Sequence, residues 1–295
     1  MKLFSKKIVN VVVFAAIVTA CFACSSLQKH ATNFPEQKLF DEKYGPYERN
    51  IMDVYLPANR GVSTPIVLMI HGGGWVGYGK ENIREYQDTL LANGIAVASI
   101  NHRYANDSTI HYHEMIVDAE AALDYCSDHA EEWHIRGNGF VVTGVSSGGH
   151  LALMTGYSSN KKIQAIVEFS APANFADTAL LNYTRQVNLL DLIQKMTGKT
   201  YQTNQPLDPA FSDASPVNYI QKDIPVLIVH GDADPVVPYS QALLLNKKLE
   251  EAGAVHKLIT LPDVGHSLQP KDSVLNKMMY SEVVNWILKY GSETN

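Results

Sequence analysis

Cysteine is scarce in this sequence. The chain of 295 residues contains three cysteines, and two of them, Cys21 and Cys24, lie near the N-terminus. Only Cys126 falls in the part that we expect to fold, so an internal disulfide is excluded. Cys126 belongs to a series from Ile116 to Trp133 that recurs at steps of three and four, as the buried stripe of a helix does. We therefore expect a core thiol and a fold stabilised by its apolar core.

An excess of basic residues is also missing. The formal net charge is −6, whereas a nucleic-acid partner usually demands a basic face. No nucleic-acid partner is expected. A metal site or other cofactor is not expected either, because the pair His111 and His113 has no carboxylate or cysteine at ligand spacing beside it. We expect this pair in a solvated loop before a helix.

The chain has no apolar run that is long enough to span a bilayer. Lys2, Lys6 and Lys7 precede the apolar run from Ile8 to Ala20, which is shorter than the roughly 20 residues that a spanning helix needs. This combination indicates an export signal.

The end of that run, Val18-Thr19-Ala20-Cys21, resembles the lipobox of bacterial lipoproteins. The resemblance implies a lipoprotein signal peptide over residues 1–20, a lipid anchor on Cys21, and an extracytoplasmic domain attached to a bacterial membrane. Cys24 is the alternative anchor. An ordinary signal peptide, which would give a secreted protein, and a single anchor helix are the other interpretations. The polar residues that follow lack periodicity, so we expect a tether over 21–39.

Strands and helices alternate through the rest of the chain. The strands are continuous apolar runs, which is typical of a mostly parallel sheet with helices on both faces. The sequence therefore predicts one α/β domain over 40–295. An antiparallel edge strand is expected over 50–56. The other expected strands are 66–70, 95–100, 140–145, 163–169, 226–229 and 257–261, and helices are expected near 80–93, 113–134, 149–157, 240–252 and 273–290.

One connection breaks this rhythm. About fifty residues separate the strand ending at Phe169 from the strand beginning at Val226, whereas α/β connections are usually far shorter. The segment, about 173–222, contains apolar helical pieces such as 179–192 and several aromatic residues. We expect a cap insertion that shapes a substrate pocket. A long crossover helix with surface loops is the alternative.

Ser146 lies in the sequence Gly144-Val145-Ser146-Ser147-Gly148, between an apolar strand and a helical stretch. A turn that pushes a serine hydroxyl out of the top of a sheet needs small residues two positions to either side. Gly144 and Gly148 meet this need. The pattern predicts a nucleophile elbow with Ser146 as the nucleophile.

A second loop can supply the donors for an oxyanion. His71-Gly72-Gly73-Gly74-Trp75 directly follows the strand 66–70. Glycines leave backbone N–H groups free to approach a substrate oxygen, and the amide of Ser147 adds another donor. Removal of one such donor typically costs ~10²-fold to 10³-fold in turnover, so we expect this loop to matter for catalysis.

The carboxylate and the base are expected in loops after the last two strands. The loop after 226–229 contains Asp232 and Asp234. We favour Asp234, which the following proline fixes, whereas Asp232 is expected to cap the turn with its own backbone. His266 follows the last strand and is the expected base. The order Ser146, Asp234, His266 is that of α/β-hydrolases among serine hydrolases.

Three other histidines are expected to be structural. His150 lies in the helix after the elbow, which carries it away from the serine hydroxyl. His71 and His230 lie at strand ends beneath glycine turns, where we expect hydrogen bonds that hold the loops in shape.

Taken together, these loops and Asn101-His102-Arg103-Tyr104 resemble those of α/β-hydrolase esterases related to hormone-sensitive lipase, acetyl and feruloyl esterases, and arylformamidases. The resemblance covers about Phe40 to Tyr290. Ser147 departs slightly, since these esterases more often have alanine there, but serine is small enough to keep the turn. The resemblance implies an α/β-hydrolase fold, with Ser146, Asp234 and His266 as catalytic residues and the amides of Gly72, Gly73 and Ser147, with Gly74 possible, as the oxyanion hole.

The expected function is that of a cofactor-free serine carboxylic ester hydrolase that works through an acyl-enzyme. Short-chain acyl, acetyl or feruloyl esters, including those of polysaccharides, are the expected substrates. An arylformamidase-like or peptidase-like amide hydrolase is one alternative, and a non-catalytic surface carbohydrate-binding protein is another. The sequence leaves open the acyl group, the alcohol, the membrane leaflet and the oligomeric state.

Overall fold

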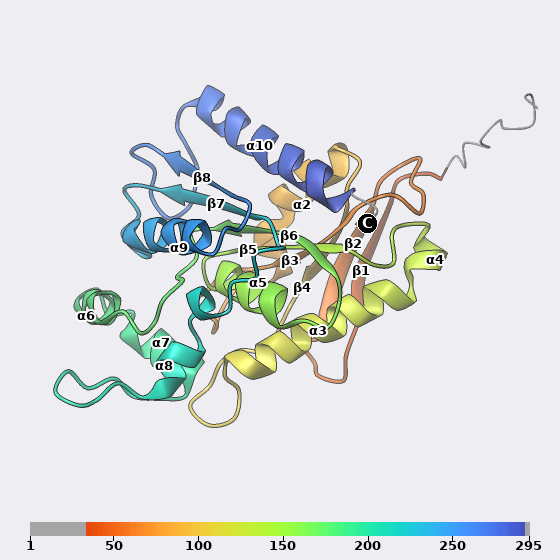
Figure 1. The fold of residues 1–295 in the computed structure, drawn as a ribbon. Helices are drawn as coiled ribbons and strands as arrows, with labels where there is room; N and C mark the ends of the chain where they lie inside the picture. The colour runs from red at the N-terminus through yellow and green to blue at the C-terminus, as the bar shows by residue number, and fades with distance from the viewer. Residues whose placement is uncertain (1–33, 293–295) are drawn as a thin grey trace, which may run out of the picture. The chain divides into compact units, whose positions relative to one another are not determined.

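The computed structural model describes residues 34–292, which are built around an eight-stranded sheet (Figure 1). The strands are β1 (Gln37–Lys43), β2 (Ile51–Leu56), β3 (Ile66–Ile70), β4 (Ala96–Ile100), β5 (Phe140–Val145), β6 (Ile163–Phe169), β7 (Val226–Gly231) and β8 (His256–Leu261). They lie in the order β1-β2-β4-β3-β5-β6-β7-β8. β2 runs antiparallel to both of its neighbours, whereas all other neighbouring strands are parallel. The expected mostly parallel sheet is confirmed.

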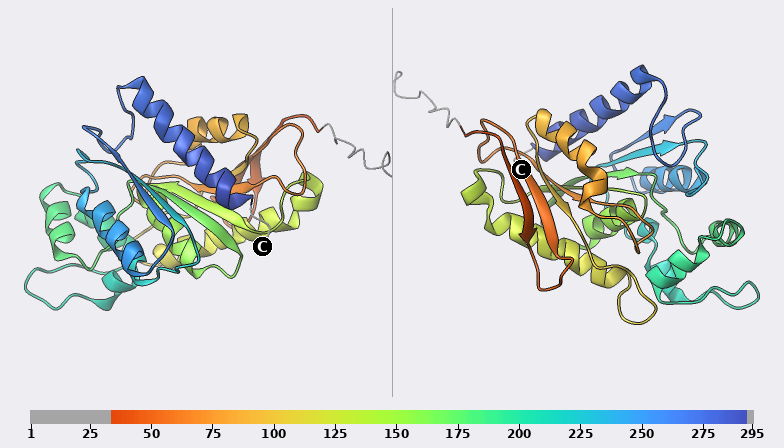
Figure 2. Two further views of the ribbon diagram at one scale, coloured as in Figure 1. Left: turned by 45° about the horizontal axis from the view of Figure 1, so that its top comes forward. Right: turned by 180° about the vertical axis from the view of Figure 1, so that it is seen from behind.

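Helices cover both faces of this sheet. The helices are η1 (Lys80–Ile83), α2 (Arg84–Ala92), α3 (Tyr112–Asp128), α4 (Ala130–Trp133), α5 (Ser147–Ser158), α9 (Ser240–Glu251) and α10 (Ser273–Gly291). The helices α3, α5 and α9 lie on one face, and α2 and α10 lie on the other (Figures 1 and 2). On β3, Leu68 and Ile70 belong to the apolar layer with α3, α5 and α9, whereas Val67 and Met69 belong to the layer with α2 and α10. Because both faces are buried there, inner strands such as β3, β4 and β7 are continuous apolar runs in the sequence.

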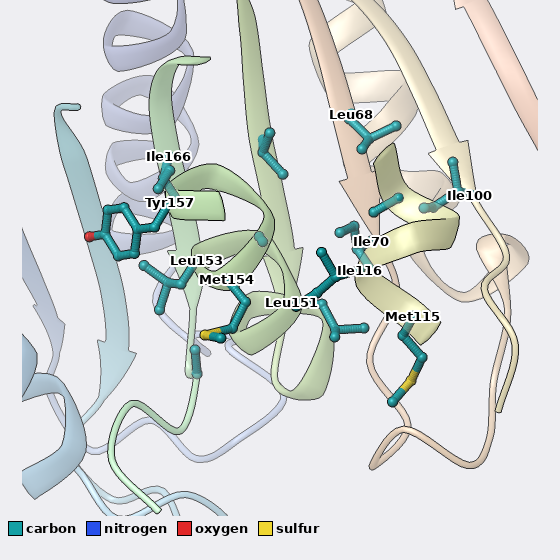
Figure 3. Close-up of a cluster of buried hydrophobic side chains, with 14 of the residues drawn as sticks. Leu68, Ile70, Ile100, Met115, Ile116, Leu151, Leu153, Met154, Tyr157 and Ile166 are labelled. Carbon is teal, nitrogen blue, oxygen red and sulfur yellow. The ribbon is translucent and has the colours of Figure 1, made fainter. Parts of the chain in front are cut away.

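The helix α5 packs directly on the centre of the sheet. All of its residues from Ser147 to Tyr157 are buried, and Figure 3 shows Leu151, Leu153 and Met154 among the surrounding apolar side chains. Burial of one leucine of this kind stabilises the fold by about 2 kcal/mol. The core therefore holds the residue at the N-terminal end of α5, Ser146, in a fixed place.

The segment between β6 and β7 folds into short helices beside the sheet (Figure 1). These are α6 (Thr178–Gln186), α7 (Leu190–Thr197), α8 (Pro209–Asp213) and η2 (Pro216–Asn218). The helical piece expected over 179–192 is two helices, because Asn188 between them adopts a positive φ of 59°. Leu181, Ile193 and Phe211 are buried in the same layer as α3 and α5, so this segment is anchored to the core.

Two expectations near the start of the domain were wrong. The strand expected at the edge, β2, is internal, because β1 pairs with its outer side. The tether expected over 21–39 cannot include residues 37–39, which pair with residues 54–56. Most side chains of β1 are exposed, so this strand has no apolar pattern to reveal it in the sequence.

A third correction concerns the helix expected over 113–134. It is divided into α3 and α4 at His129. The expectation for Cys126 in this helix is confirmed, since its side chain is buried and burial raises the pKa of the thiol to about 12.

The expected signal peptide over 1–20 and the two candidate anchors, Cys21 and Cys24, lie outside the described residues. Between residues 34 and 292, no helix is both long and apolar enough to cross a membrane.

Candidate active site

Ser146 occupies a strained turn between β5 and α5. Its φ of 58° and ψ of −122° are angles that a residue other than glycine rarely adopts. A Cβ on Gly144 would come closer than 3.0 Å to the backbone of Gly148, and a Cβ on Gly148 would come as close to the carbonyls of Ile70 and His71. Any side chain at position 144 or 148 would therefore overlap backbone atoms, so the elbow needs glycine at both positions, as the sequence indicates.

Replacement of Gly148 with alanine is expected to lower the free energy of unfolding by about 1–3 kcal/mol, because the added methyl overlaps two backbone carbonyls. Urea denaturation of the variant measures the loss. The matched control is Gly61→Ala, since a Cβ there meets nothing within 4 Å. Equal stabilities of the two variants would show that the elbow is not packed as described.

His266 connects Ser146 with Asp234. Its Nε2 lies 2.9 Å from Oγ of Ser146, and its Nδ1 lies 2.7 Å from Oδ2 of Asp234. A neutral ring that carries its proton on Nδ1 donates to the carboxylate and accepts from the serine hydroxyl. The structure thus brings together the three side chains singled out from the sequence, each from a loop at the end of a different strand.

The carboxylate of Asp234 is held from several sides. Its Oδ1 accepts from the amides of Val236 and Val237 at 2.8 and 2.9 Å. Burial alone would raise the pKa of Asp234, but the hydrogen bonds from His230, His266 and the backbone hold that pKa well below its ordinary value. Asp234 is therefore an ionised partner for His266 at neutral pH.

Asp232 has a different partner from the one expected. Its Oδ1 accepts from the amide of Asp263 at 2.7 Å, so it connects the loop after β7 to the loop that carries His266. The expected bond within its own turn is not what the structure shows. This partner could not be found from local sequence, because it lies 31 residues further along the chain.

His230 is a second histidine beside Asp234. Its Nε2 lies 2.9 Å from the carbonyl oxygen of Val237 and 3.4 Å from Oδ2 of Asp234. The bond to Val237 confirms that His230 helps to hold the loop, but the contact with Asp234 was missed. The spacing of four residues within one tight turn was the available signal.

The glycine loop after β3 borders the space in front of Ser146. Gly73 and Gly74 adopt positive φ values of 107° and 62°, which glycine tolerates best. Gly72, Gly73, Gly74 and Ser147 all line the same cavity as Ser146. Ser147 is also the first residue of α5, where the helix dipole favours negative charge. The backbone around the serine is therefore suited to stabilise an oxyanion.

Trp75 and His150 join this loop to the helix behind the serine. Trp75 Nε1 donates to His150 Nδ1 at 3.1 Å, and His150 Nε2 donates to the carbonyl oxygen of Ala214 at 2.9 Å. Burial lowers the pKa of His150 to about 4, so the ring is neutral. The structural role expected for His150 is confirmed, whereas its link between the glycine loop and the 173–222 segment is visible only in three dimensions.

Replacement of His150 with glutamine is expected to weaken the pH dependence of stability. The unfolded chain binds a proton below about pH 6.5 that the folded ring, with its pKa of about 4, does not bind. Stability is therefore lost as the pH falls through this window, by about 1.4 kcal/mol per pH unit for one proton. Urea denaturation from pH 6 to pH 4.5 should give a shallower slope for the glutamine variant, which retains a donor and an acceptor. Identical slopes would contradict a neutral buried His150.

His71 and His102 form a stacked pair behind the glycine loop. Their ring centroids lie 4.5 Å apart, and His71 Nδ1 lies 2.6 Å from the carbonyl oxygen of Gly72. Burial lowers the pKa of His71 to about 3 and that of His102 to about 4. Both rings are neutral, and the expected loop-holding role of His71 is confirmed.

The expectation that His111 and His113 lie in a solvated loop is wrong. His111 precedes α3, but its Nδ1 lies 2.8 Å from the carbonyl oxygen of Lys195 in α7, and His113 lies within α3. Among the residues from 34 to 292, no group of three or more histidine, cysteine, aspartate or glutamate side chains could hold a metal ion.

A cavity of about 800 Å³ opens over Ser146 and His266. Part of its buried wall comes from the 173–222 segment and includes Phe175, Leu180 and Ile193. Its exposed rim is more polar and comprises Tyr78, Asn82, Glu85, Ser267 and Gln269. The cavity therefore offers an apolar compartment next to the serine and a polar opening to solvent.

The sequence resembles curated esterases. It is 24% identical over 263 residues to Esterase LipQ of Mycobacterium tuberculosis, covering 84% of this chain and 61% of LipQ. It is 24% identical over 247 residues to Esterase LipC of the same organism, covering 78% of this chain and 59% of LipC. The chain thus spans about three-fifths of the length of these relatives.

Solved structures share the fold. A truncated form of a carbohydrate esterase from gut microbiota matches with a TM-score of 0.71 and 23% identity, covering 90% of this chain and 99% of that one. A bifunctional GH43-CE protein of Bacteroides eggerthii matches with a TM-score of 0.72 and 23% identity, covering 86% of this chain and 35% of that one. The fold is the α/β-hydrolase fold. Because residues 52–249 match the BD-FAE family, this chain belongs to that family.

Proposed function

We propose that this protein is a serine carboxylesterase with Ser146 as nucleophile, His266 as general base and acid, and Asp234 as the group that orients His266. The observation that carries the proposal is the position of His266, within hydrogen-bond distance of both Ser146 and Asp234 at the base of an open cavity. The names of the relatives LipQ and LipC support ester hydrolysis.

In the proposed reaction, Oγ of Ser146 attacks the ester carbonyl while Nε2 of His266 accepts its proton. The C–O bond to the alcohol then breaks, and His266 returns the proton to the departing alkoxide. Asp234 stabilises the charged imidazole between these steps. Water repeats the sequence on the acyl-enzyme and releases the acid. The amides of Gly72, Gly73 and Ser147, with Gly74 as a further candidate, are proposed to stabilise the negative oxygen of each tetrahedral intermediate.

We further propose short-chain or aromatic acyl esters of carbohydrates as substrates. The apolar wall formed by Phe175, Leu180 and Ile193 suits an acyl group such as acetyl or feruloyl, and a cavity of about 800 Å³ has room for the larger of these. The exposed polar rim suits a sugar alcohol. One of the structurally similar proteins is described as a carbohydrate esterase and another as a bifunctional GH43-CE protein, which supports the same substrate class.

Matched esters and amides test this proposal. We expect turnover of p-nitrophenyl acetate, methyl ferulate and acetylated xylan, and no turnover of p-nitroacetanilide, which carries the same acetyl group on an amide. Release of amine without hydrolysis of any ester would favour an amide hydrolase. Binding to xylan without release of acid would favour a carbohydrate-binding protein.

We also propose that the protein is exported and anchored to the membrane through Cys21. The support is the basic and apolar N-terminal pattern that ends at this residue. Membrane fractionation of the full chain should show loss of the anchor in Cys21→Ala and retention in Cys24→Ala. The opposite result would move the anchor to Cys24, and release of the unsubstituted protein into the medium would indicate secretion.

A further inference from the structure

Glu168 is a buried carboxylate that the proposed reaction does not use. It lies near the end of β6 and is fully buried. Its Oε2 accepts from the amide of Ala171 at 2.8 Å, whereas its Oε1 has no hydrogen-bond partner among the described residues. An ionised carboxylate in an apolar core is costly unless an opposite charge compensates it.

His230 is the complementary group on the neighbouring strand. β6 and β7 run parallel, with Phe169 beside Val229, so Glu168 and His230 lie near the same end of adjacent strands. His230 is fully buried, and its Nε2 donates to Val237 and approaches Asp234. Its Nδ1 has no partner within the part of the chain that the structure describes. Oε1 of Glu168 on β6 is thus an acceptor without a donor, and Nδ1 of His230 on β7 is a ring nitrogen without a hydrogen-bond partner.

We propose that Glu168 and His230 form a buried, water-bridged ion pair, with His230 protonated on both ring nitrogens, and that this pair is a positioning unit behind Asp234. The inference rests on the proposed function only for its effect on catalysis. Neither Nδ1 of His230 nor Oε1 of Glu168 has a hydrogen-bond partner among the described residues, so in the proposed pair one water bridges protonated Nδ1 and the carboxylate. Nε2–H remains shared between Val237 and Asp234. The pair is neutral as a whole, so the core does not enclose an uncompensated charge.

The surroundings favour the charged ring. Burial alone would lower the pKa of His230, but the hydrogen bond to Asp234 and the charge of Glu168 raise it. Burial raises the pKa of Glu168 to about 7, and His230 opposes that shift. Tyr157 of α5, labelled in Figure 3, and Tyr239, which precedes α9, also face these groups, and neither brings a second positive charge.

The consequence for catalysis follows from one shared oxygen. Oδ2 of Asp234 lies 2.7 Å from His266 Nδ1 and 3.4 Å from His230 Nε2. A cationic His230 offsets part of the negative charge of the Asp234 carboxylate that faces His266, so loss of that cation is expected to change the pH dependence of the reaction. His230 also fixes the orientation of the carboxylate. Both effects act through Asp234, so Glu168 and His230 are positioning residues.

The pH profile of kcat/KM on p-nitrophenyl acetate tests the pair in the full chain. In Glu168→Gln and in His230→Gln, we expect the acidic limb to move upward by about one pH unit. Because the two residues act as one unit, the double variant should show the same shift as either single variant. Tyr157→Phe is the control, since it removes a hydroxyl from the same cluster without changing its charge, and it should leave the limb in place.

An unchanged acidic limb in both single variants, or shifts that add in the double variant, would overturn the proposal. A merely structural role would lower the melting temperature and the plateau of kcat/KM without moving the limb.

A measurement on the unsubstituted protein covers the case in which a variant fails to fold. With ¹⁵N-labelled histidine, long-range NMR correlations at pH 7 should show a ring at position 230 with both nitrogens protonated. A neutral ring would overturn the ion pair. This spectrum does not depend on activity, so it tests the ion pair alone. An unsubstituted protein that hydrolyses no ester would instead contradict the esterase proposal.

Discussion

Replacement of Ser146 with alanine is expected to lower kcat on p-nitrophenyl acetate by on the order of 10⁴-fold to 10⁶-fold. The reason is that the substitution removes the only nucleophilic atom within reach of His266 Nε2 in the described residues, while leaving the cavity and the glycine loop intact. Steady-state kinetics on the purified variant measures the loss. The residual rate reports what binding and the oxyanion donors contribute alone.

Ser158→Ala is the matched control for this variant. Ser158 lies at the opposite end of α5 from Ser146, and its hydroxyl donates only to the helix carbonyl of Met154. We expect wild-type kinetics from this variant and a similar melting temperature for both. Activity in Ser146→Ala above a tenth of the wild-type value would refute the assignment of the nucleophile.

Replacement of Asp234 with asparagine is expected to lower kcat by on the order of 10⁴-fold. An amide cannot accept from His266 Nδ1 if its NH₂ group occupies the position of Oδ2, so the ring adopts the wrong tautomer and cannot take the serine proton. Because the Asp234 pKa lies below its ordinary value, the carboxylate also contributes stability that is complete above the unfolded pKa of about 3.8 and is lost as the pH falls further. The variant should therefore lose stability at neutral pH as well.

Asp232→Asn separates the two aspartates of this loop. The asparagine oxygen can still accept from the amide of Asp263, so the connection to the His266 loop is kept. We expect activity within about tenfold of wild type, as for other residues that do not touch the reacting atoms. A loss as large as that of Asp234→Asn would mean that the carboxylates have been assigned the wrong way round.

The parts of the site that could be predicted from the sequence are those in which local geometry demands a particular residue. The elbow needs Gly144 and Gly148 because any side chain there would overlap backbone. The loop after β3 needs glycine where φ is positive, as at Gly73 and Gly74. Both restrictions act over a few residues, so they produce short glycine motifs that can be recognised in the sequence.

The parts that could not be predicted depend on partners far away in the chain. Asp232 accepts a hydrogen bond from the amide of Asp263 in another loop, and Trp75 of the glycine loop donates to His150 in α5. Strand order brings these segments together. The edge strand β1 was missed for another reason. Its side chains are mostly exposed, so backbone pairing with β2 rather than an apolar pattern holds it in the sheet.

Peptide mapping after reaction with a fluorophosphonate tests most directly whether His266 activates Ser146. We predict a single adduct on Ser146 in the unsubstituted protein and almost none in His266→Ala, although the serine itself is still present. An adduct on a different serine, or labelling of Ser146 that proceeds equally fast without the imidazole, would contradict the proposed catalytic site.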